Sequence, residues 1–263
     1  MALNENLVCE FYTNSEKEEN RAYTSKARGL EFHYTKKLLS KYVSKEALVI
    51  EIGCATGYYG IYLHDKCKEY TGIDITPKHI EKFNEKIMEL KLKNIRAFVG
   101  NAINLNSIGD NSYDVVLILG PMYHLSAKER ELALLEAKRI CKINGIIMCS
   151  YINKLGGYLQ EGILVSPEKY PNKKANEFIL EKGTDDIKTD LFFLTTPEEM
   201  EEMAISKGLK IMENCGVDFL FNMEHINTMD DEKYKCWIEF SDYMFSSKSC
   251  TGLSIHAIMV CRK

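Results

Sequence analysis

The stretch from Leu48 to Gly57, L-V-I-E-I-G-C-A-T-G, constrains the fold of this chain more than any other part of the sequence. An apolar run leads into Gly53, and Gly57 precedes a helical pattern. A short strand that ends at a glycine turn and opens a helix is typical of a nucleotide-binding βα unit. Gly53 permits a tight turn beside a ligand, and Gly57 lets the helix begin close to the strand. The N–H groups at such a helix start favour a carboxylate or a phosphate.

A second apolar run, residues 70–73, ends at Asp74, roughly 20 residues after Gly53, where dinucleotide-binding folds place the acidic residue that binds a ribose diol. The alternative is that Asp74 caps the helix that follows. Thr76 and Pro77 form a better N-cap and first-turn pair for that helix. We therefore predict that the Asp74 carboxylate is left to bind a ligand.

Apolar runs and helical patterns alternate along most of the chain. We predict strands at 47–52, 70–74, 95–99, 115–119, 146–152, 209–213 and 253–261, and helices at 57–66, 77–90, 126–145 and 196–208. Ser126 with Glu129, and Thr196 with Glu199, have the spacing of capping boxes. The wholly apolar strand at 115–119 suits a parallel strand that is buried on both faces. Strands that alternate with helices predict an α/β fold with right-handed crossovers.

Four motifs in this order and spacing resemble the class I S-adenosylmethionine-dependent methyltransferases: E-I-G-C-A-T-G, G-I-D-I-T-P, V-G-N-A and Y-D-V-V-L-I-L-G. The specific part of the resemblance spans residues 48–150. Ala55 replaces a common middle glycine, Asn101 replaces a common aspartate, and I-N-G-I at 143–146 replaces a proline-glycine-glycine turn. Ala55 is small enough to keep the loop, and Asn101 can still hydrogen-bond an adenine amino group, so none of these departures excludes cofactor binding.

The resemblance implies a Rossmann-like, seven-stranded, mostly parallel sheet in the order 3-2-1-4-5-7-6, with the last strand antiparallel and helices on both faces. We predict a single methyltransferase domain over 1–263, in which residues 1–45 form a helical lid. The first 20 residues are predicted to be polar and partly disordered or lid-like, with a helix over 18–42. Long insertions are more often functional than idle, so we expect those at 153–190 and 217–250 to form a substrate cap.

The resemblance also implies S-adenosylmethionine as the methyl donor and S-adenosylhomocysteine as the product. Asp74 would bind the ribose hydroxyls, and Glu51 would accept from the ammonium group or from ordered water. The predicted cofactor-binding residues are Glu51, Gly53, Cys54, Ala55, Gly57, Asp74, Ile75, Asn101, Ala102, Leu119 and Gly120. From the N-terminal segment, Tyr12, Arg21 and Glu31 could reach the pocket, although a surface helix is an equally good interpretation of each.

The acceptor is usually recognised by the loop after the fourth strand, which reads G-P-M-Y-H from Gly120 to His124. His124 could accept a proton from a hydroxyl, thiol or amine, because the ordinary histidine pKa of about 6.5 is near working pH. Alternatively, His124 hydrogen-bonds the backbone or packs under the cap, and the sequence leaves both interpretations open. Tyr123 is the weaker candidate for binding substrate, since a tyrosine beside a buried strand is usually part of the core.

We expect a small-molecule acceptor and neither a nucleic acid nor a membrane as a partner. The loop lacks the N-P-P-Y-like tetrapeptide of enzymes that methylate nucleobases, and G-P-x-Y-H-L resembles a bacterial group of small-molecule methyltransferases. The net charge of −4 gives no basic field for nucleic acid. The sequence does not predict the oligomeric state. A catalytically silent S-adenosylmethionine-binding regulatory protein is the alternative function, whereas a nicotinamide dehydrogenase would need G-x-G-x-x-G in place of G-C-A-T-G-Y.

The nine cysteines form no C-x-x-C pair and no close cluster with histidines, so no metal site is predicted. There is no signal peptide and no apolar run of membrane-spanning length. These features predict a soluble protein in a reducing, cytoplasmic setting.

Overall fold

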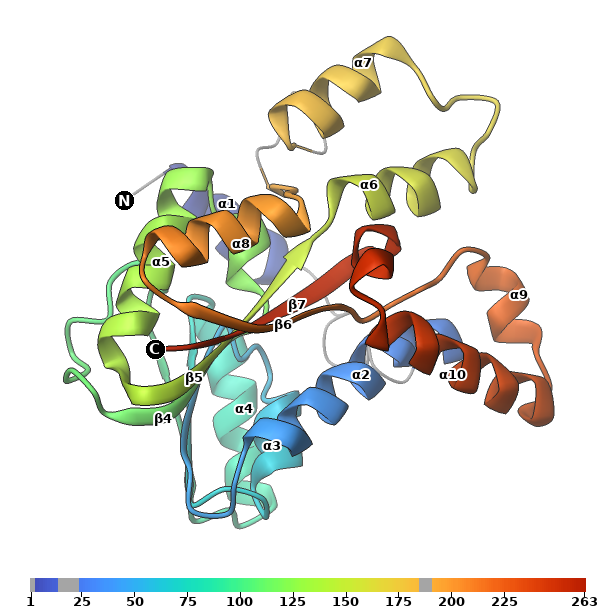
Figure 1. The fold of residues 1–263 in the computed structure, drawn as a ribbon. Helices are drawn as coiled ribbons and strands as arrows, with labels where there is room; N and C mark the ends of the chain where they lie inside the picture. The colour runs from blue at the N-terminus through green and yellow to red at the C-terminus, as the bar shows by residue number, and fades with distance from the viewer. Residues whose placement is uncertain (1–2, 14–23, 185–190) are drawn as a thin grey trace.

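The computed structural model describes residues 3–13, 24–184 and 191–263. Its centre is a seven-stranded sheet in the order β3-β2-β1-β4-β5-β7-β6, in which β7 runs antiparallel to both of its neighbours (Figure 1). The strands are β1 (Leu48–Ile52), β2 (Glu69–Asp74), β3 (Ile95–Val99), β4 (Tyr113–Ile118), β5 (Cys141–Ile152), β6 (Lys210–Gly216) and β7 (His256–Arg262). This order and the antiparallel last strand confirm the predicted Rossmann-like fold.

Helices cover both faces of the sheet and create two hydrophobic cores. On one face lie α2 (Lys26–Tyr42), α3 (Tyr58–Leu63), α4 (Pro77–Glu89) and α10 (Asp231–Ser246), and on the other lie α5 (Ala127–Ile140) and α8 (Pro197–Ser206). Successive residues of a strand point to opposite faces, so Val115 and Leu117 of β4 enter the first core and Val116 and Ile118 enter the second. β4 is thus buried on both faces, as its apolar run predicts.

The two predicted capping boxes are present. At the start of α5, the Glu129 carboxylate accepts the Ser126 backbone N–H at 3.0 Å. At the start of α8, Thr196 and Glu199 exchange the equivalent pair of hydrogen bonds. These caps satisfy N–H groups that the first turn of a helix leaves without partners.

The end of α5 differs from its prediction. The sequence predicts that the helix ends at Asn144-Gly145, whereas α5 ends at Ile140 and β5 begins at Cys141. Asn144 has a φ of +64°, and the pairing of β4 with β5 shifts register in this region. The asparagine and glycine therefore form an irregularity within the strand, where an α-helix cannot continue because Cys141 already pairs with Tyr113.

The N-terminal segment, predicted to form a helical lid, contains two helices. The stretch predicted to be polar and partly disordered or lid-like contains helix α1 (Leu3–Thr13). α2 occupies the C-terminal part of the helix predicted over 18–42. Residues 14–23 lie outside the described residues, and Arg21 with them.

The predicted insertions form short helices. The segment after β5 contains α6 (Lys154–Gly157), η3 (Tyr158–Ile163), α7 (Lys173–Ala175) and η4 (Asn176–Lys182), and it projects away from the sheet (Figure 1). The segment after β6 contains α9 (Met223–Thr228) and α10, followed by η5 (Lys248–Leu253) where the sequence predicts the start of the last strand. This second segment packs against α2, and the Tyr34 hydroxyl donates to the Ile238 carbonyl at 3.2 Å. None of the described helices combines the length and the apolar content that a membrane span requires.

Candidate active site

A cavity lies at the carboxyl ends of β1, β2 and β4, the edge at which open parallel α/β sheets bind ligands. Residues of α1 and α2 line it as well. Every predicted cofactor-binding residue except Gly57 lines this cavity, namely Glu51, Gly53, Cys54, Ala55, Asp74, Ile75, Asn101, Ala102, Leu119 and Gly120. The two predicted substrate-binding residues, Tyr123 and His124, line it too, so residues that are far apart in sequence meet in one place.

At Gly53 and Gly57 the loop needs glycine, because the backbone is left-handed and a Cβ atom would clash with a neighbouring side chain. Gly53 and Gly57 have φ values of +82° and +85°. A Cβ atom on Gly53 would lie 2.4 Å from Pro121 Cδ, and a Cβ atom on Gly57 would lie 2.0 Å from Phe83 Cε2. Gly57 therefore acts by packing against α4, below the surface of the cavity, which explains why it is absent from the lining.

Ala55 also lies in the left-handed region, with a φ of +45°. For a residue with a Cβ atom this conformation costs roughly 1–2 kcal/mol. The Ala55 N–H donates to Asp74 Oδ2 at 2.9 Å, and this hydrogen bond ties the loop to the end of β2. The chain thus keeps the shape of the loop although the common middle glycine is missing.

The Asp74 carboxylate is more engaged than the sequence predicts. Besides the Ala55 N–H, it accepts the Thr76 N–H through Oδ1 at 2.8 Å. Thr76 is the N-cap residue of α4, but its side chain makes no capping hydrogen bond. The prediction that Thr76 leaves Asp74 to the ligand is therefore wrong in this detail. A carboxylate has about four acceptor positions, so Asp74 can still accept from a ligand.

Glu51 is a buried acid beneath the loop. It is 2% exposed, and the Tyr70 hydroxyl donates to its carboxylate. Burial raises the pKa of Glu51 to about 8, because the charged form loses its hydration, although the Tyr70 hydrogen bond opposes this effect. Below that pH Glu51 is mostly neutral, and a cationic ligand group beside it would favour the carboxylate form.

Helix α1 reaches the predicted adenine edge. The Asn101 side-chain amide donates to the Glu5 carboxylate, and Asn101 Oδ1 accepts the Ile103 N–H at 3.0 Å. Glu5 and Val8 of α1 line the cavity as well. Asn101 therefore lines the cavity with both ends of its amide engaged by protein groups, and its place beside adenine stays a prediction.

His124 has protein partners on both ring nitrogens. Nδ1 lies 2.8 Å from the Leu191 carbonyl, and Nε2 lies 2.8 Å from the Tyr12 hydroxyl. Because a carbonyl oxygen can only accept, Nδ1 carries the proton and Nε2 accepts from Tyr12. Burial lowers the pKa of His124 to about 4. The backbone hydrogen bond that is one of the two predicted alternatives is thus present, and the role of general base stays a prediction.

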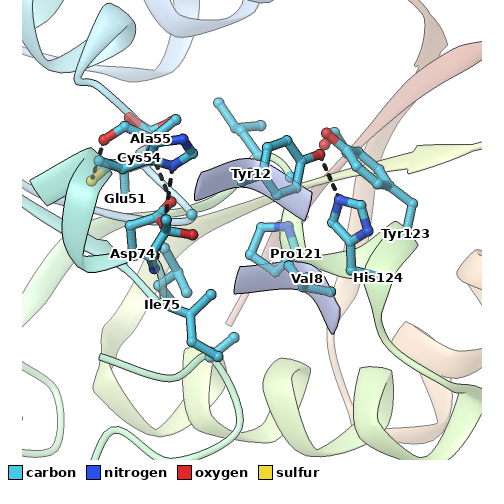
Figure 2. A pocket seen from close by; sticks show the side chains of 18 of the residues that line it. Val8, Tyr12, Glu51, Cys54, Ala55, Asp74, Ile75, Pro121, Tyr123 and His124 are labelled. Atoms are coloured by element: carbon cyan, nitrogen blue, oxygen red, sulfur yellow. Dashed lines mark hydrogen bonds and ion pairs between the residues drawn. The ribbon is translucent and has the colours of Figure 1, made fainter. Parts of the chain in front are cut away.

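Figure 2 shows Tyr12 lying between the two parts of the cavity. Glu51, Cys54, Ala55 and Asp74 lie on one side of the tyrosine, and we call this group the donor side. Tyr123 and His124 lie on the other side, together with the hydrogen bond to the Tyr12 hydroxyl. We call the part of the cavity lined by Tyr12, Glu31, Tyr123, His124 and Ser150 the acceptor side.

A network of polar side chains borders the acceptor side. Asp218 is 3% exposed, and its carboxylate accepts from His256 Nδ1 at 2.6 Å and from the Ser254 hydroxyl at 2.8 Å. Glu31, Asp218 and His256 offer atoms that all lie within 4.8 Å of one another, so this group of described residues could hold a metal ion. Because Asp218 also accepts the His256 backbone N–H, we interpret the group as a network that joins the end of β6 to the start of β7.

The sequence missed several lining residues. They come from α1 (Glu5, Val8), from α2 (Phe32, Thr35), from the start of α3 and α4 (Tyr58, Tyr59, His79) and from sheet strands or the segment after β6 (Ser150, Val217, Ile258). Only Tyr58, Tyr59 and His79 lie near a sequence motif, because they follow E-I-G-C-A-T-G and G-I-D-I-T-P. Among the described residues of the two insertions, Val217 alone lines the cavity, so their role as a substrate cap stays a prediction.

The residues present fit S-adenosylmethionine. Gly53 leaves no room for a Cβ atom against Pro121, and this packing holds the backbone of the loop at the cavity lining. Asp74 provides carboxylate oxygens for ribose hydroxyls, and Glu51 is a buried acid suited to an ammonium group. The donor-side geometry therefore matches the donor that the motifs imply.

Comparisons with known proteins agree with this geometry. A model of the methyltransferase domain matches residues 44–208, which is more than half of the chain. The chain therefore belongs to this methyltransferase family. A search of curated proteins found no match.

Solved structures share the fold at low sequence identity. Phosphoethanolamine N-methyltransferase 1 of Haemonchus contortus, solved with phosphoethanolamine and S-adenosylhomocysteine, is 15% identical with a TM-score of 0.63, and the match covers 99% of this chain and 49% of that one. An S-adenosylmethionine-dependent methyltransferase of Thermotoga maritima is 16% identical with a TM-score of 0.59, and the match covers 97% and 98%. The [4+2]-cyclase SpnF is also 16% identical with a TM-score of 0.59, and the match covers 88% and 80%. These likenesses show the fold and leave the reaction to the site.

Proposed function

We propose that this protein transfers the methyl group of S-adenosylmethionine to a small-molecule acceptor. The observation that carries the proposal is the meeting of the glycine loop with Asp74 and Glu51 at the sheet edge, inside a chain that belongs to a methyltransferase family. When bound, S-adenosylmethionine supplies an electrophilic methyl group on a sulfonium. The chain has to hold that donor, orient the acceptor and exclude water, and positioning alone can contribute roughly 7–11 kcal/mol.

The charge of the cavity supports a cationic donor. Five acidic side chains line it, of which buried Glu51 is mostly neutral below about pH 8 unless a cation lies beside it, and none of its described lining residues is lysine or arginine; the acids are Glu5, Glu31, Glu51, Asp74 and Glu129. A cavity with one sign of charge favours ligands of the opposite sign. The sulfonium and ammonium groups of the donor are both cations, so this arrangement favours S-adenosylmethionine over nicotinamide dinucleotides, whose pyrophosphate is anionic.

Tyr12 and His124 are proposed to handle the acceptor and its proton. Because Nδ1 of His124 donates to Leu191, Nε2 is the nitrogen that can take a proton, and the Tyr12 hydroxyl lies against it. When the methyl acceptor gives its proton to the Tyr12 oxygen, the Tyr12 hydroxyl would give its own proton to His124 Nε2. Burial lowers the pKa of His124 to about 4, so the imidazole is neutral and its Nε2 lone pair is available, but it is a weaker base than an exposed histidine.

A small acceptor is supported by the walls of the acceptor side. Tyr12 crosses the cavity from α1, and the ring of Phe192 packs on His124 with centroids 4.9 Å apart. The net charge of −4 again favours neither nucleic acid nor an anionic membrane surface as a partner. We propose a reducing, cytoplasmic setting, because all nine cysteines are unpaired in the structure.

The test is the release of S-adenosylhomocysteine when the protein and S-adenosylmethionine are incubated with a panel of small amines, alcohols, phenols, thiols and acids. Product that forms only with a particular acceptor supports the proposal. Tight donor binding without turnover on any acceptor would instead favour the catalytically silent regulatory protein. Methylated product must be identified by mass, because a cyclase shares this fold.

A further inference from the structure

His79 lies at the donor side of the cavity and has a buried ring nitrogen without a hydrogen-bond partner. It is the third residue of α4, it lines the cavity, and it is 5% exposed. Its Nδ1 atom has no hydrogen-bond partner in the structure. A buried polar atom in this state costs free energy, so such atoms usually pair with protein, water or a ligand.

The nearest acid does not satisfy this nitrogen. His79 Nδ1 lies 3.4 Å from Asp74 Oδ1, which is longer than an ordinary N–H···O hydrogen bond. Asp74 Oδ1 already accepts the Thr76 N–H at 2.8 Å, and Oδ2 accepts the Ala55 N–H. The carboxylate is thus held in place by backbone groups, beside the imidazole rather than bonded to it.

The surroundings of His79 limit how far its ring can turn away. The residue is fixed in the first turn of α4 behind Pro77, and the ring of Tyr12 packs edge-on against the imidazole with centroids 5.7 Å apart. Nδ1 therefore stays beside the Asp74 carboxylate, and both residues line the cavity. A ligand hydroxyl at this point would find an acceptor and a donor side by side.

We propose that His79 is a donor-binding residue, whose Nδ1–H donates to the same ribose hydroxyl that donates to Asp74. A hydroxyl can donate one hydrogen bond and accept others, so a carboxylate satisfies only its proton. The imidazole N–H satisfies a lone pair of the same oxygen. The inference rests on the proposed function, because it takes S-adenosylmethionine as the ligand, and nothing in the sequence motifs assigns a role to this position.

Calorimetry with S-adenosylhomocysteine as the probe tests the inference without knowledge of the acceptor. His79→Leu is expected to bind about tenfold more weakly than the unmodified protein, since it removes one hydrogen bond. His79→Asn places an amide near the position of Nδ1 and is expected to restore most of the affinity. His64→Leu is the matched control, because His64 is exposed and its Nδ1 is bonded to the Ile61 carbonyl.

Analogues of S-adenosylhomocysteine that lack the 2′- or the 3′-hydroxyl identify the bonded atom. The unmodified protein is expected to bind one of them about tenfold or more weakly, and His79→Leu is expected to show little further loss with that analogue. If the losses of affinity from the analogue and from His79→Leu multiply when combined, the two groups are independent and the inference is overturned. A folded His79→Leu protein with unchanged affinity would overturn it as well. If His79→Leu does not fold, His79→Phe replaces it and keeps a flat ring.

The outcome separates this inference from the proposed function. An unmodified protein that does not bind S-adenosylhomocysteine contradicts the proposed function itself. Normal binding by the unmodified protein together with normal binding by folded His79 variants contradicts only the role of His79.

Discussion

The donor side and the acceptor side of the cavity are built in different ways. On the donor side, backbone conformation and local hydrogen bonds define the shape, and the Ala55 N–H reaches Asp74 across only 19 positions of the chain. On the acceptor side, the Tyr12 hydroxyl meets His124 across 112 positions. A local motif can bind a donor that is the same for a whole family. An acceptor site assembled from distant elements can then change without disturbing the donor site.

The two sides also differ in how their charges are held. Glu51 and Asp74 are buried acids that protein groups already hydrogen-bond. His124 is a neutral base whose low pKa results from burial. The donor side therefore suits a cation, whereas the acceptor side presents an uncharged imidazole.

The largest expected effect concerns the backbone of the donor side. Gly57→Ala should destabilise the fold by about 2–5 kcal/mol, from left-handed strain of about 1–2 kcal/mol and overpacking against Phe83 of about 1–3 kcal/mol. Urea unfolding measures this loss, and calorimetry should show that donor binding is lost with it. Gly252→Ala is the matched control, because a Cβ atom there meets nothing within 4 Å. Equal stability of the two variants would show that the loop does not need glycine at position 57.

A second prediction tests whether the acceptor side acts separately from the donor side. His124→Ala should keep the affinity for S-adenosylhomocysteine within a few-fold and lower turnover on the identified acceptor by roughly 10²-fold or more, the range for the loss of a general base. Tyr12→Phe removes the hydroxyl that meets His124 and should lower turnover in the same direction. Unchanged turnover of the His124 variant across a full pH profile would leave positioning and desolvation as the whole of the catalysis.

The third prediction separates the two roles of Asp74. Asp74→Ala should weaken donor binding by about 1–3 kcal/mol, the scale for hydrogen bonds to a charged group, and should also loosen the loop that Ala55 and Thr76 tie to it. Asp74→Asn keeps an acceptor oxygen for only one of these two N–H groups, and it should lose affinity with less loss of stability than Asp74→Ala. Calorimetry and urea unfolding on the same samples distinguish the effects. Normal binding by Asp74→Ala would exclude Asp74 as the ribose ligand.

The last prediction is a pH dependence of stability from Glu51. Its folded pKa of about 8 lies above its ordinary value of 4.5, so the folded protein holds a proton that the unfolded chain releases between these values. The free energy of unfolding should therefore fall as the pH rises through this window, by at most about 1.4 kcal/mol per pH unit, and level off above about 8. Glu51→Gln should lack this contribution. Urea unfolding of both proteins at a series of pH values checks it, and parallel curves would show that Glu51 does not titrate there.

The sequence predicts the fold well, and the residues predicted to bind the donor, Gly57 excepted, line one cavity, because both depend on local patterns. Apolar runs, capping boxes such as Ser126 with Glu129, and the glycine spacing each identify an element from a few neighbouring residues. Irregular backbone is harder to predict. Asn144-Gly145 could end a helix or interrupt a strand, and the pairing of β5 with β4 makes it a strand irregularity.

The acceptor side is hard to predict because contacts between distant parts of the chain form it. Tyr12 is assigned to the pocket only as one option, and Ser150 and Ile258 carry no signal that separates a lining residue from a core residue. The absence of a hydrogen-bond partner for His79 Nδ1 depends on how α4 packs beside Asp74, which the sequence alone does not give. Contacts between distant elements have no spacing rule that a single sequence can reveal.

The most direct test of the central claim is calorimetric titration of the unmodified protein with S-adenosylmethionine, S-adenosylhomocysteine and NAD. The glycine loop, Asp74 and the acidic lining predict that the first two bind and that NAD does not. Binding of NAD, with no binding of either sulfur-containing ligand, would contradict the account.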